Sequence, residues 1–354
     1  MAENKLLGAY DEVEVEDTLL LKDFAPRTML KQTGNIPDKA GFPAIDAHVH
    51  LDETGERDVS FYLKLMDEVG LEACVSIQQL WAEELLGYLK RFSGTHPDRF
   101  RVVCWAAADK LAEPGGVQKI LDGMKSYKDA GLAGFKFWKD LGLTARDAQG
   151  NLWRIDDERL DPIWELASQL DFPIIFHTTD PSAFWQPIDR FNERYEELIR
   201  HPDWGFNDPT RYPAKEQVLA QQEAVIRRHP STRFWAAHCA ARGENLSELA
   251  RMLETYPNFF LDTSARINEL GRQPWTSREL LVRWADRIGF GSDLLPEAQM
   301  YRLCWRFFET RDEYWDYPSH PSRQGRWKVH SLEVPDDTLR KIYHDTARRF
   351  YWGA

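Results

Sequence analysis

The feature that most constrains the fold of this chain is a regular alternation between short apolar runs and longer amphipathic segments. Residues 59–69, 117–130 and 160–170 carry apolar side chains at three- and four-residue spacing, which predicts helices. Apolar runs that lie between such helices and are often bounded by Gly or Pro predict buried strands. Eight runs fit this description: Pro43–His50, Ala73–Ile77, Arg101–Trp105, Ala133–Trp138, Phe172–His177, Thr232–His238, Phe259–Asp262 and Arg287–Gly291.

This alternation predicts an α/β fold with parallel strands. Strands and helices that alternate through short connections form parallel sheets with right-handed crossovers, and eight such units fit a closed barrel. The chain has 354 residues, 43% of them hydrophobic, which is enough for one large core. We therefore predict a (β/α)₈ TIM barrel over residues 41–354. A doubly wound open sheet is the alternative, because periodicity alone does not show closure and the second and seventh runs are weak.

Two segments do not fit the barrel repeat. Residues 1–40 are polar and irregular, and we interpret them as an N-terminal extension outside the barrel domain. Residues 178–231 separate the fifth and sixth runs and contain several aromatic side chains, among them Trp185 and Trp204. Loops of this length are usually functional or disordered, and the aromatic content argues against disorder. We expect 178–231 to be a lid insertion over the barrel mouth; an insertion that only buries outer barrel surface is the alternative.

Composition excludes several classes of function. The formal net charge is −12, which opposes non-specific binding to nucleic acid or to anionic membranes. No window approaches the roughly 18 apolar residues that a membrane span needs. The acidic N-terminus lacks the basic and apolar regions of a signal peptide. The four cysteines are widely spaced, as is typical of reduced thiols. We expect a cytoplasmic protein whose partner is a small-molecule substrate.

Metal-binding side chains stand at the ends of four predicted strands. Alternate residues of a strand share a face, so His48 and His50 should point the same way. His177 and His238 end the fifth and sixth runs, and Asp293 follows the eighth. TIM-barrel enzymes carry their chemistry at the C-terminal ends of the strands. One such residue alone is often a polar side chain where a strand meets a loop, but five residues from four strands predict a common site.

The motifs around these residues resemble a known family. They are Asp46-Ala47-His48-Val49-His50, Gly134-Phe135-Lys136-Phe137, Ile175-Phe176-His177, Ala237-His238 and Phe290-Gly291-Ser292-Asp293. Together they are similar to the amidohydrolase superfamily, in particular its amidohydrolase-related branch of metal-dependent hydrolases and non-oxidative decarboxylases. The resemblance covers about residues 43–350, the whole predicted barrel. It says little about the substrate.

The resemblance implies a metal site. In mononuclear family members, the residues that match His48, His50, His177 and Asp293 bind one divalent cation. The match to His238 either binds a second metal or orients substrate and water. Zinc with such ligands and one open position lowers the pKa of a bound water to about 7, so we expect zinc, with manganese as the alternative. Asp293 and His238 are the candidate catalytic residues, with Asp293 moving a proton from the water to a leaving group.

Lys136 leaves three alternatives open. Some superfamily members use a carboxylated lysine at the end of the fourth strand to bridge two metals, which here is less expected than a single metal. An unmodified lysine binds a substrate carboxylate or extends to the barrel rim without a role. Trp138 shares the face of Lys136 and is a further candidate for substrate contact. Lys139 should point to the opposite face or into the loop. Asp46 should share the face of His48, deeper in the barrel, as a packing or hydrogen-bonding residue.

Arg266 follows the seventh run at the predicted mouth of the barrel. Arginine forms bidentate pairs with carboxylates, so Arg266 is a candidate anchor for an acidic substrate. A structural ion pair with Glu269 is the alternative. The lid stretch that ends at Arg194 is a weaker candidate for the same role.

Two reactions fit these residues. The first hypothesis is hydrolysis of an amide, lactone or ester through attack of an activated water on a carbonyl. The second is non-oxidative decarboxylation of an aromatic or unsaturated carboxylic acid. A barrel that binds a ligand without catalysis is disfavoured, because the set of ligand-type residues is complete. Family members are often dimers, so a homodimer is expected by analogy alone.

Overall fold

The structure of the protein, a computed structural model, describes residues 19–31, 34–51, 57–105, 108–293, 296–317 and 324–353. The chain divides into two compact units, Met1–Thr33 and Gly34–Ala354. In the first unit, the described residues contain a short 3₁₀ turn, Leu21–Asp23. The second unit is the barrel. Its boundary lies seven residues before the expected start at residue 41. Residues 1–18 and 32–33 of the predicted extension lie outside the described residues.

Eight parallel strands follow one another in sequence order around one sheet. They are β1 (Ala44–Val49), β2 (Leu71–Gln78), β3 (Phe100–Trp105), β4 (Gly134–Phe137), β5 (Ile174–Phe176), β6 (Phe234–Ala236), β7 (Phe259–Asp262) and β8 (Ile288–Gly289). Two backbone hydrogen bonds close the sheet: Ala47 N donates to Phe290 O (2.9 Å), and Asp293 N donates to His48 O (2.8 Å). The predicted (β/α)₈ barrel is confirmed, and the open-sheet alternative is wrong.

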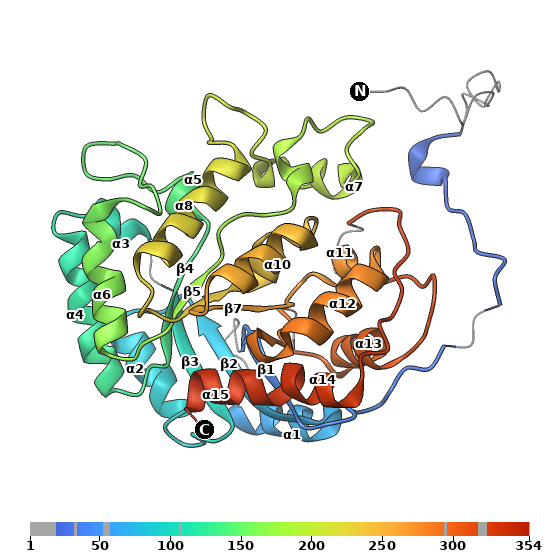
Figure 1. Cartoon of the computed structure of the whole chain (residues 1–354), viewed down its shortest axis with the longest axis horizontal. Helices are drawn as coiled ribbons and strands as arrows, with labels where there is room; N and C mark the ends of the chain where they lie inside the picture. Colours follow the sequence, from blue (N-terminus) through green and yellow to red (C-terminus); the bar gives the residue numbers. More distant parts are fainter. Residues whose placement is uncertain are drawn as a thin grey trace. The chain divides into compact units, whose positions relative to one another are not determined.

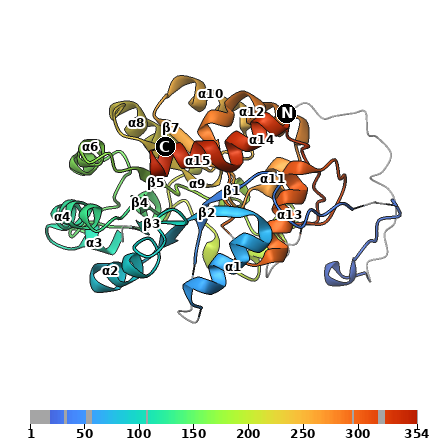
Figure 2. The same ribbon diagram turned by 90° about the horizontal axis from the view of Figure 1, so that it is seen from below.

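Helices surround the strands, as the view in Figure 2 shows. The seven that connect consecutive strands are α1 (Val59–Val69), α2 (Ala82–Arg91), α4 (Gly116–Asp129), α6 (Asp161–Gln169), α8 (Lys215–Arg228), α10 (Leu246–Thr255) and α12 (Pro274–Trp284). After β8 come α13 (Ala298–Glu309), α14 (Asp336–Arg340), the π-helical segment Lys341–Asp345 and α15 (Thr346–Trp352). Short helices lie in the loops: α3 (Ala108–Ala112), α5 (Asp140–Leu143), α7 (Tyr195–Leu198), α9 (Ala237–Ala240) and α11 (Ile267–Gly271). Within the described ranges, no helix combines the length and apolarity needed to cross a membrane.

Helix α1 shows how local sequence sets these elements. The carboxylate of Asp58 accepts a hydrogen bond from the backbone N–H of Phe61 (3.0 Å) and so caps the start of the helix. The helix ends at Gly70, which has a left-handed conformation (φ 87°) that favours glycine. Between these ends, the buried side chains recur at helical spacing and form one apolar face: Tyr62, Leu65, Met66 and Val69.

The N-terminal end of the barrel is filled by apolar side chains. Ile45, Val75, Ile175 and Trp235 belong to one buried cluster that also contains Phe350 of α15. The ring of Phe350 lies 4.8 Å from the ring of Trp235, measured between centroids. This packing fills the interior of the barrel at that end, and the histidine-bearing end is where barrel enzymes carry their chemistry.

The segment predicted as a lid divides into two parts. Its last portion, Lys215–Arg228, is α8, the ordinary crossover helix between β5 and β6. Residues 178–214 contain two 3₁₀ turns, Ser182–Trp185 and Pro202–Trp204, and the short helix α7. In Figure 1, α7 and α15 lie at opposite ends of the barrel unit. Residues 178–214 are therefore placed on the side where the histidine-bearing strands end.

Candidate metal centre and active-site cavity

His48 lies at the centre of the site and is held by a buried carboxylate. Its Nδ1 is 3.1 Å from Oδ2 of Asp262, the last residue of β7, and both side chains are fully buried. Because a carboxylate only accepts, Nδ1 carries the proton and Nε2 presents a lone pair. Trp235 Nε1 donates to the same oxygen of Asp262 (2.8 Å). The imidazole of His48 is therefore fixed in both tautomer and orientation.

A β-bulge in β1 separates the faces of Asp46 and His48. The β1–β2 register shifts between Asp46 and Val49, so strict alternation is lost there. Asp46 accepts hydrogen bonds from Tyr301 on α13 (2.8 Å) and from the hydroxyl of Ser292 (2.5 Å). The expectation that Asp46 shares the face of His48 is wrong, because the bulge turns it toward α13. Burial raises the pKa of Asp46 to about 6, although these hydrogen bonds lower it.

His50 and Asp293 complete a compact group with His48. Oδ1 of Asp293 lies 3.1 Å from Nε2 of His50 and 3.4 Å from Nε2 of His48. One ligand-type atom from each of the three lies within 4.8 Å of the others. Asp293 has a left-handed backbone (φ 51°), a conformation that is costly for most residues and recurs at functional sites. A Cβ on Gly291 would lie 2.9 Å from Cβ of His48, so the chain needs glycine here.

His238 presents a second lone pair to this group. Its Nδ1 lies 3.0 Å from the backbone carbonyl of Ser264, which can only accept, so Nδ1 carries the proton. Nε2 is buried, has no hydrogen-bond partner among the described residues, and lies 3.8 Å from Oδ2 of Asp293. Residues 238–241 all have left-handed backbone conformations, which form the turn that places His238 at the end of β6. His238 is thus built to accept a proton or hydrogen bond at Nε2.

His177 stands beside this group rather than within it. Its ring centroid is 4.3 Å from that of His238. Among the described residues, two compact groups could hold a metal, and neither includes His177: His48, His50 and Asp293, and His48, His238 and Asp262. Nε2 lies 3.4 Å from Oδ1 of Asp180, while Nδ1 is buried without a hydrogen-bond partner. Asp180 also forms an ion pair with Lys139. The role of His177 as the fourth metal ligand remains a prediction.

Lys136 lies inside the barrel, against His48. Its Nζ is 3.0 Å from Nε2 of His48, and the residue is 2% exposed. The alternative in which Lys136 extends to the barrel rim is wrong, because β4 directs the side chain inward. Burial lowers the pKa of Lys136. Because of its short distance to His48, Nζ of Lys136 lies next to the cluster formed by His48, His50 and Asp293.

A cavity of about 550 Å³ opens from these residues toward segment 178–214. His177, His238 and Asp293 line its floor. Its walls combine charged side chains with five aromatic ones, Trp138, Phe184, Trp204, Phe206 and Tyr212. Lys139, expected to face away or into the loop, lies in the loop after β4 and lines this cavity. The space is in the usual size range of small-molecule sites.

Two arginines line the cavity, and only one of them is neutralised. Arg194 is 2% exposed and pairs with Glu197 (2.7 Å) and with Glu269. Arg266 is 7% exposed and donates to the carbonyl of Ala265 (2.8 Å). No carboxylate of a described residue lies within ion-pair distance of Arg266. The alternative in which Arg266 pairs with Glu269 is wrong, because Glu269 pairs with Arg194 instead.

The protonation of the site suits a divalent cation. Burial lowers the pKa of His48, and it lowers that of His177 to about 4, so both imidazoles are neutral at pH 7. Burial opposes ionisation of Asp293, but the neighbouring histidines hold its pKa well below the usual value. Neutral imidazoles with an ionised carboxylate are the donor set that zinc and manganese accept. The lone pair on the unpartnered Nε2 of His238 is a further possible metal ligand, so these residues fit a divalent metal.

Sequence reasoning missed two carboxylates. Asp262 ends the seventh run and lies two residues before Ser264. Alternate residues of a strand share a face, so this spacing was the signal that Asp262 points into the barrel. Asp180 lies in the loop three residues after His177, where no periodic pattern applies. Both orient histidines rather than forming the cluster with Asp293, and their contacts depend on tertiary structure.

A TIM barrel with histidines and an aspartate gathered at the C-terminal ends of its strands defines the class of metal-dependent barrel enzymes. The chain belongs to the amidohydrolase family, whose match spans residues 45–352. This confirms the family resemblance inferred from the sequence motifs. No curated protein matches the chain.

Solved structures with similar folds include decarboxylases and amidohydrolases. An uncharacterized TIM-barrel protein of Bordetella bronchiseptica is 15% identical (TM-score 0.56; 87% of this chain, 98% of that chain). A dihydroxybenzoic acid decarboxylase of Polaromonas sp. JS666, with bound manganese, is 14% identical (TM-score 0.54; 88% and 97%). An amidohydrolase of Burkholderia multivorans, with bound zinc, is 14% identical (TM-score 0.50; 88% and 99%). At these identities the likeness establishes the fold.

Proposed function

We propose that this protein is a metal-dependent hydrolase that uses water to cleave an amide, lactone or ester of a carboxylate-bearing small molecule. The observation that carries this proposal is the group of ligand atoms on His48, His50 and Asp293, with the lone pair of His238 facing it. We assign His48, His50, Asp293 and, by family resemblance, His177 as ligands of one divalent ion. Zinc is the expected ion, with manganese as the alternative. When bound, the ion acts as a Lewis acid and makes water nucleophilic near pH 7.

The chain's own residues supply the proton transfers. Asp293 has one carboxylate oxygen near His50 and the other near His238, so it can take a proton from the attacking water and pass it to the leaving group. His238 accepts a hydrogen bond at Nε2 and orients that water. Asp262 does not touch the substrate; it keeps His48 in the required tautomer.

Substrate binding is assigned to the cavity above these residues. Arg266 is buried and has no carboxylate partner among the described residues, which is costly unless a ligand supplies the counter-charge. We therefore assign Arg266 as the anchor for a substrate carboxylate. Trp138 lines the same cavity and, with the aromatic side chains of segment 178–214, packs against the rest of the substrate. This segment is proposed to be the lid, which excludes water from the site.

Non-oxidative decarboxylation is the second candidate. The specific observation in its favour is the uncommitted Arg266 in an aromatic cavity, which suits an aromatic acid. Against it, the tautomer of His238 leaves Nε2 without a proton, so Asp293 would have to deliver the proton to carbon. The neighbouring histidines hold the pKa of Asp293 well below its usual value, although burial raises it, which makes this carboxyl group a poor proton donor. Hydrolysis is therefore the reaction that the geometry supports better.

A substrate panel separates the two reactions. The metal-loaded protein is incubated with lactones and amides while acid release is followed, and with hydroxybenzoates while CO₂ release is followed. Hydrolysis predicts acid release that Asp293→Asn abolishes. CO₂ release from any acid, without turnover of any lactone or amide, would refute the hydrolase assignment.

Metal analysis tests the ligand set. We expect about one equivalent of divalent metal per chain, as in other mononuclear barrel sites. His50→Ala and Asp293→Ala should each reduce this strongly. His177→Ala tests the fourth ligand: retention of a full equivalent would remove His177 from the set. Two equivalents, together with extra mass on Lys136, would indicate the carboxylated-lysine form instead.

A further inference from the structure

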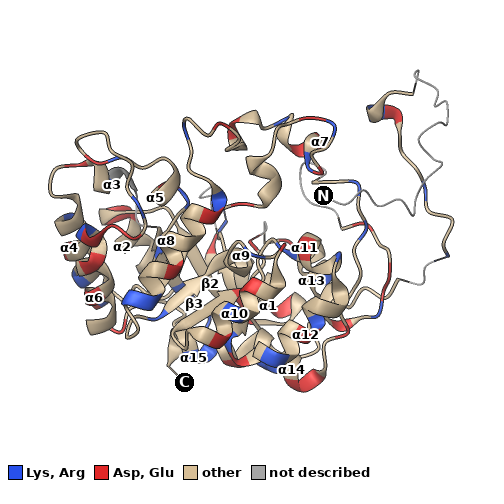
Figure 3. Cartoon of the chain, turned by 45° about the horizontal axis from the view of Figure 1, so that its top comes forward, with Lys and Arg blue, Asp and Glu red and all other residues tan. Residues whose placement is uncertain are grey.

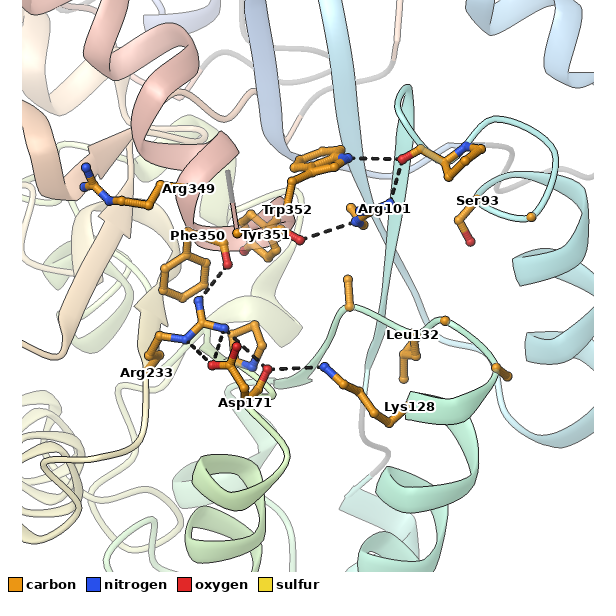
Figure 4. A pocket seen from close by; sticks show the side chains of 17 residues that line it. Ser93, Arg101, Lys128, Leu132, Asp171, Arg233, Arg349, Phe350, Tyr351 and Trp352 are labelled. Carbon is orange, nitrogen blue, oxygen red and sulfur yellow. Dashed lines mark hydrogen bonds and ion pairs between the residues drawn. The ribbon is translucent and has the colours of Figure 1, made fainter.

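A second cavity, of about 710 Å³, lies at the N-terminal end of the barrel. It is bounded by the starts of β3 to β6 and by the end of α15 (Figure 4). Four cations line it. One is Arg349 of α15, which donates to the carbonyl of Asp286. The other three are Arg101 from the start of β3, Lys128 from the end of α4, and Arg233 directly before β6. Among the described residues that line it, Asp171 is the single carboxylate. None of these residues takes part in the candidate active site.

The three cations are held in place by hydrogen bonds that leave donors unused. Arg101 donates to the carbonyls of Pro97 (2.6 Å) and Tyr351 (3.3 Å). Lys128 donates to the carbonyl of Asp171 (3.3 Å). Arg233 donates to Phe350 O (2.6 Å) and pairs with the Asp171 carboxylate (2.8 Å). An arginine has five N–H donors and a lysine three, so each cation keeps N–H groups for another acceptor.

These partners do not balance the positive charge. Asp171 neutralises Arg233, and no other carboxylate of a described residue lies within ion-pair distance of Arg101 or Lys128. The carbonyls of Phe350 and Tyr351 belong to the last turn of α15, which carries roughly half a negative charge. Capping this helix end therefore accounts for part of the arrangement. Of the three positive charges on Arg101, Lys128 and Arg233, Asp171 offsets one and the helix end about half of another, so about one and a half remain.

The excess positive charge stands out in this chain, whose formal net charge is −12. Acidic and basic residues are interspersed over the outer helices (Figure 3). At the second cavity, burial lowers the pKa of Arg101, and the nearby charge of Arg348 lowers it further. A bound anion would favour the charged form of Arg101.

We propose that this cavity binds a phosphorylated small molecule, whose phosphate lies between Arg101, Lys128 and Arg233. Arg101 and Arg233 reach the cavity from the starts of two strands and Lys128 from the end of a helix. A tetrahedral phosphate can accept from several directions, whereas a carboxylate accepts in one plane. The remaining volume is bordered by apolar side chains such as Leu132 and Trp352, which suit an organic portion. The site is separate from the proposed hydrolase site and does not depend on that assignment.

Calorimetric titration of the metal-loaded protein with inorganic pyrophosphate at low ionic strength tests this site. We expect one binding event per chain. Lys128→Gln should weaken it about tenfold or more, as expected for loss of a charged hydrogen bond. Lys125→Gln, on the exposed side of the same helix, is the matched control and should leave the affinity unchanged. Arg101→Lys keeps the charge but loses the planar fork, and should also bind more weakly.

Three outcomes would overturn the proposal. The first is absence of any pyrophosphate binding, and the second is equal weakening by both lysine variants, which would indicate non-specific attraction. The third is loss of binding in Asp293→Ala, which would place the anion at the candidate metal centre instead. Tricarballylate, a tricarboxylate, distinguishes the anion class: weaker binding than pyrophosphate supports a phosphate site, and tighter binding refutes it.

Discussion

We expect no contact between Asp262 and the substrate, yet several groups of the site depend on this carboxylate. Its Oδ2 accepts from His48 and Trp235, and its Oδ1 accepts from the backbone N–H groups of His238 and Ser264. Both oxygens are thus occupied by donors in a fully buried position. In Asp262→Asn, an amide NH₂ must face one of these pairs of donors, which leaves buried polar groups unsatisfied.

We therefore predict that Asp262→Asn weakens metal binding about 10- to 100-fold, because His48 loses its fixed orientation. Competition with a chromogenic chelator measures this affinity. Asp286→Asn is the control, since Asp286 is exposed and pairs with Lys341 at the surface. Equal metal affinity in Asp262→Asn and the parent protein would show that His48 does not need this carboxylate.

The residue scale also shows what the sequence can and cannot reveal. Strand-end position was enough to select His48, His50 and Asp293, because residues at the ends of parallel strands meet at one mouth. It misplaced Asp46, because a bulge in β1 leaves no mark in a single sequence. The partner of Arg266 was equally out of reach, since Glu269 had two possible arginines and only tertiary packing chooses between them.

At the scale of elements, the Arg194 cluster connects the proposed lid segment to α11. Arg194 lies just before α7, and its partners are Glu197 in that helix and Glu269 in α11. All three side chains are nearly inaccessible to solvent. Such a pair is weak evidence for stability by itself, but removing one member leaves uncompensated buried charge.

Arg194→Gln should lower the free energy of unfolding by about 3–5 kcal/mol at pH 7. Burial already raises the pKa of Glu197 while Arg194 lowers it, so removal of Arg194 raises it further. A raised carboxyl pKa destabilises the folded state at higher pH, and the loss is relieved as pH falls through that pKa. Denaturant unfolding at pH 7.5 and pH 5 measures the change, which should be smaller at pH 5.

Arg272→Gln provides the comparison for this experiment. Arg272 pairs with Glu193 (2.7 Å), but both side chains are partly exposed, so its loss should cost at most about 1 kcal/mol. If the two variants are equally stable, the buried cluster does not hold the segment in place.

The elements themselves were largely predictable from periodicity. Each of the eight apolar runs contains or overlaps a strand, including the weak second and seventh runs, because buried parallel strands need continuous apolar side chains. The extent of the lid segment was not predictable. Its C-terminal third, Lys215–Arg228, is a crossover helix, and the many polar residues of α8 hide the apolar stripe of Val218, Val225 and Ile226.

At the scale of the whole molecule, the four cysteines report on the packing of the core. All four are buried thiols, and burial raises the pKa of Cys74, Cys104, Cys239 and Cys304. Thiolate is the reactive form, so the native protein should react slowly with Ellman's reagent at pH 8. Four thiols should react promptly after denaturation in guanidinium chloride. A thiol that reacts promptly in the native protein would contradict this packing.

Metal removal should also affect the molecule as a whole, because the proposed ligands come from the two edges at which the barrel closes. His48 and His50 lie at the end of β1, and Asp293 follows β8; two backbone hydrogen bonds join these edges. An ion that binds only the folded state adds about 2.7 kcal/mol at a free concentration of 100 times its Kd, or a few degrees in Tm. Scanning calorimetry with and without EDTA should therefore show a lower Tm in EDTA.

His50→Ala, which is expected to bind metal poorly, should unfold at the same temperature in both buffers. A parent protein that holds one equivalent of metal and yet shows no EDTA effect would mean that the ion does not bridge the closure of the barrel.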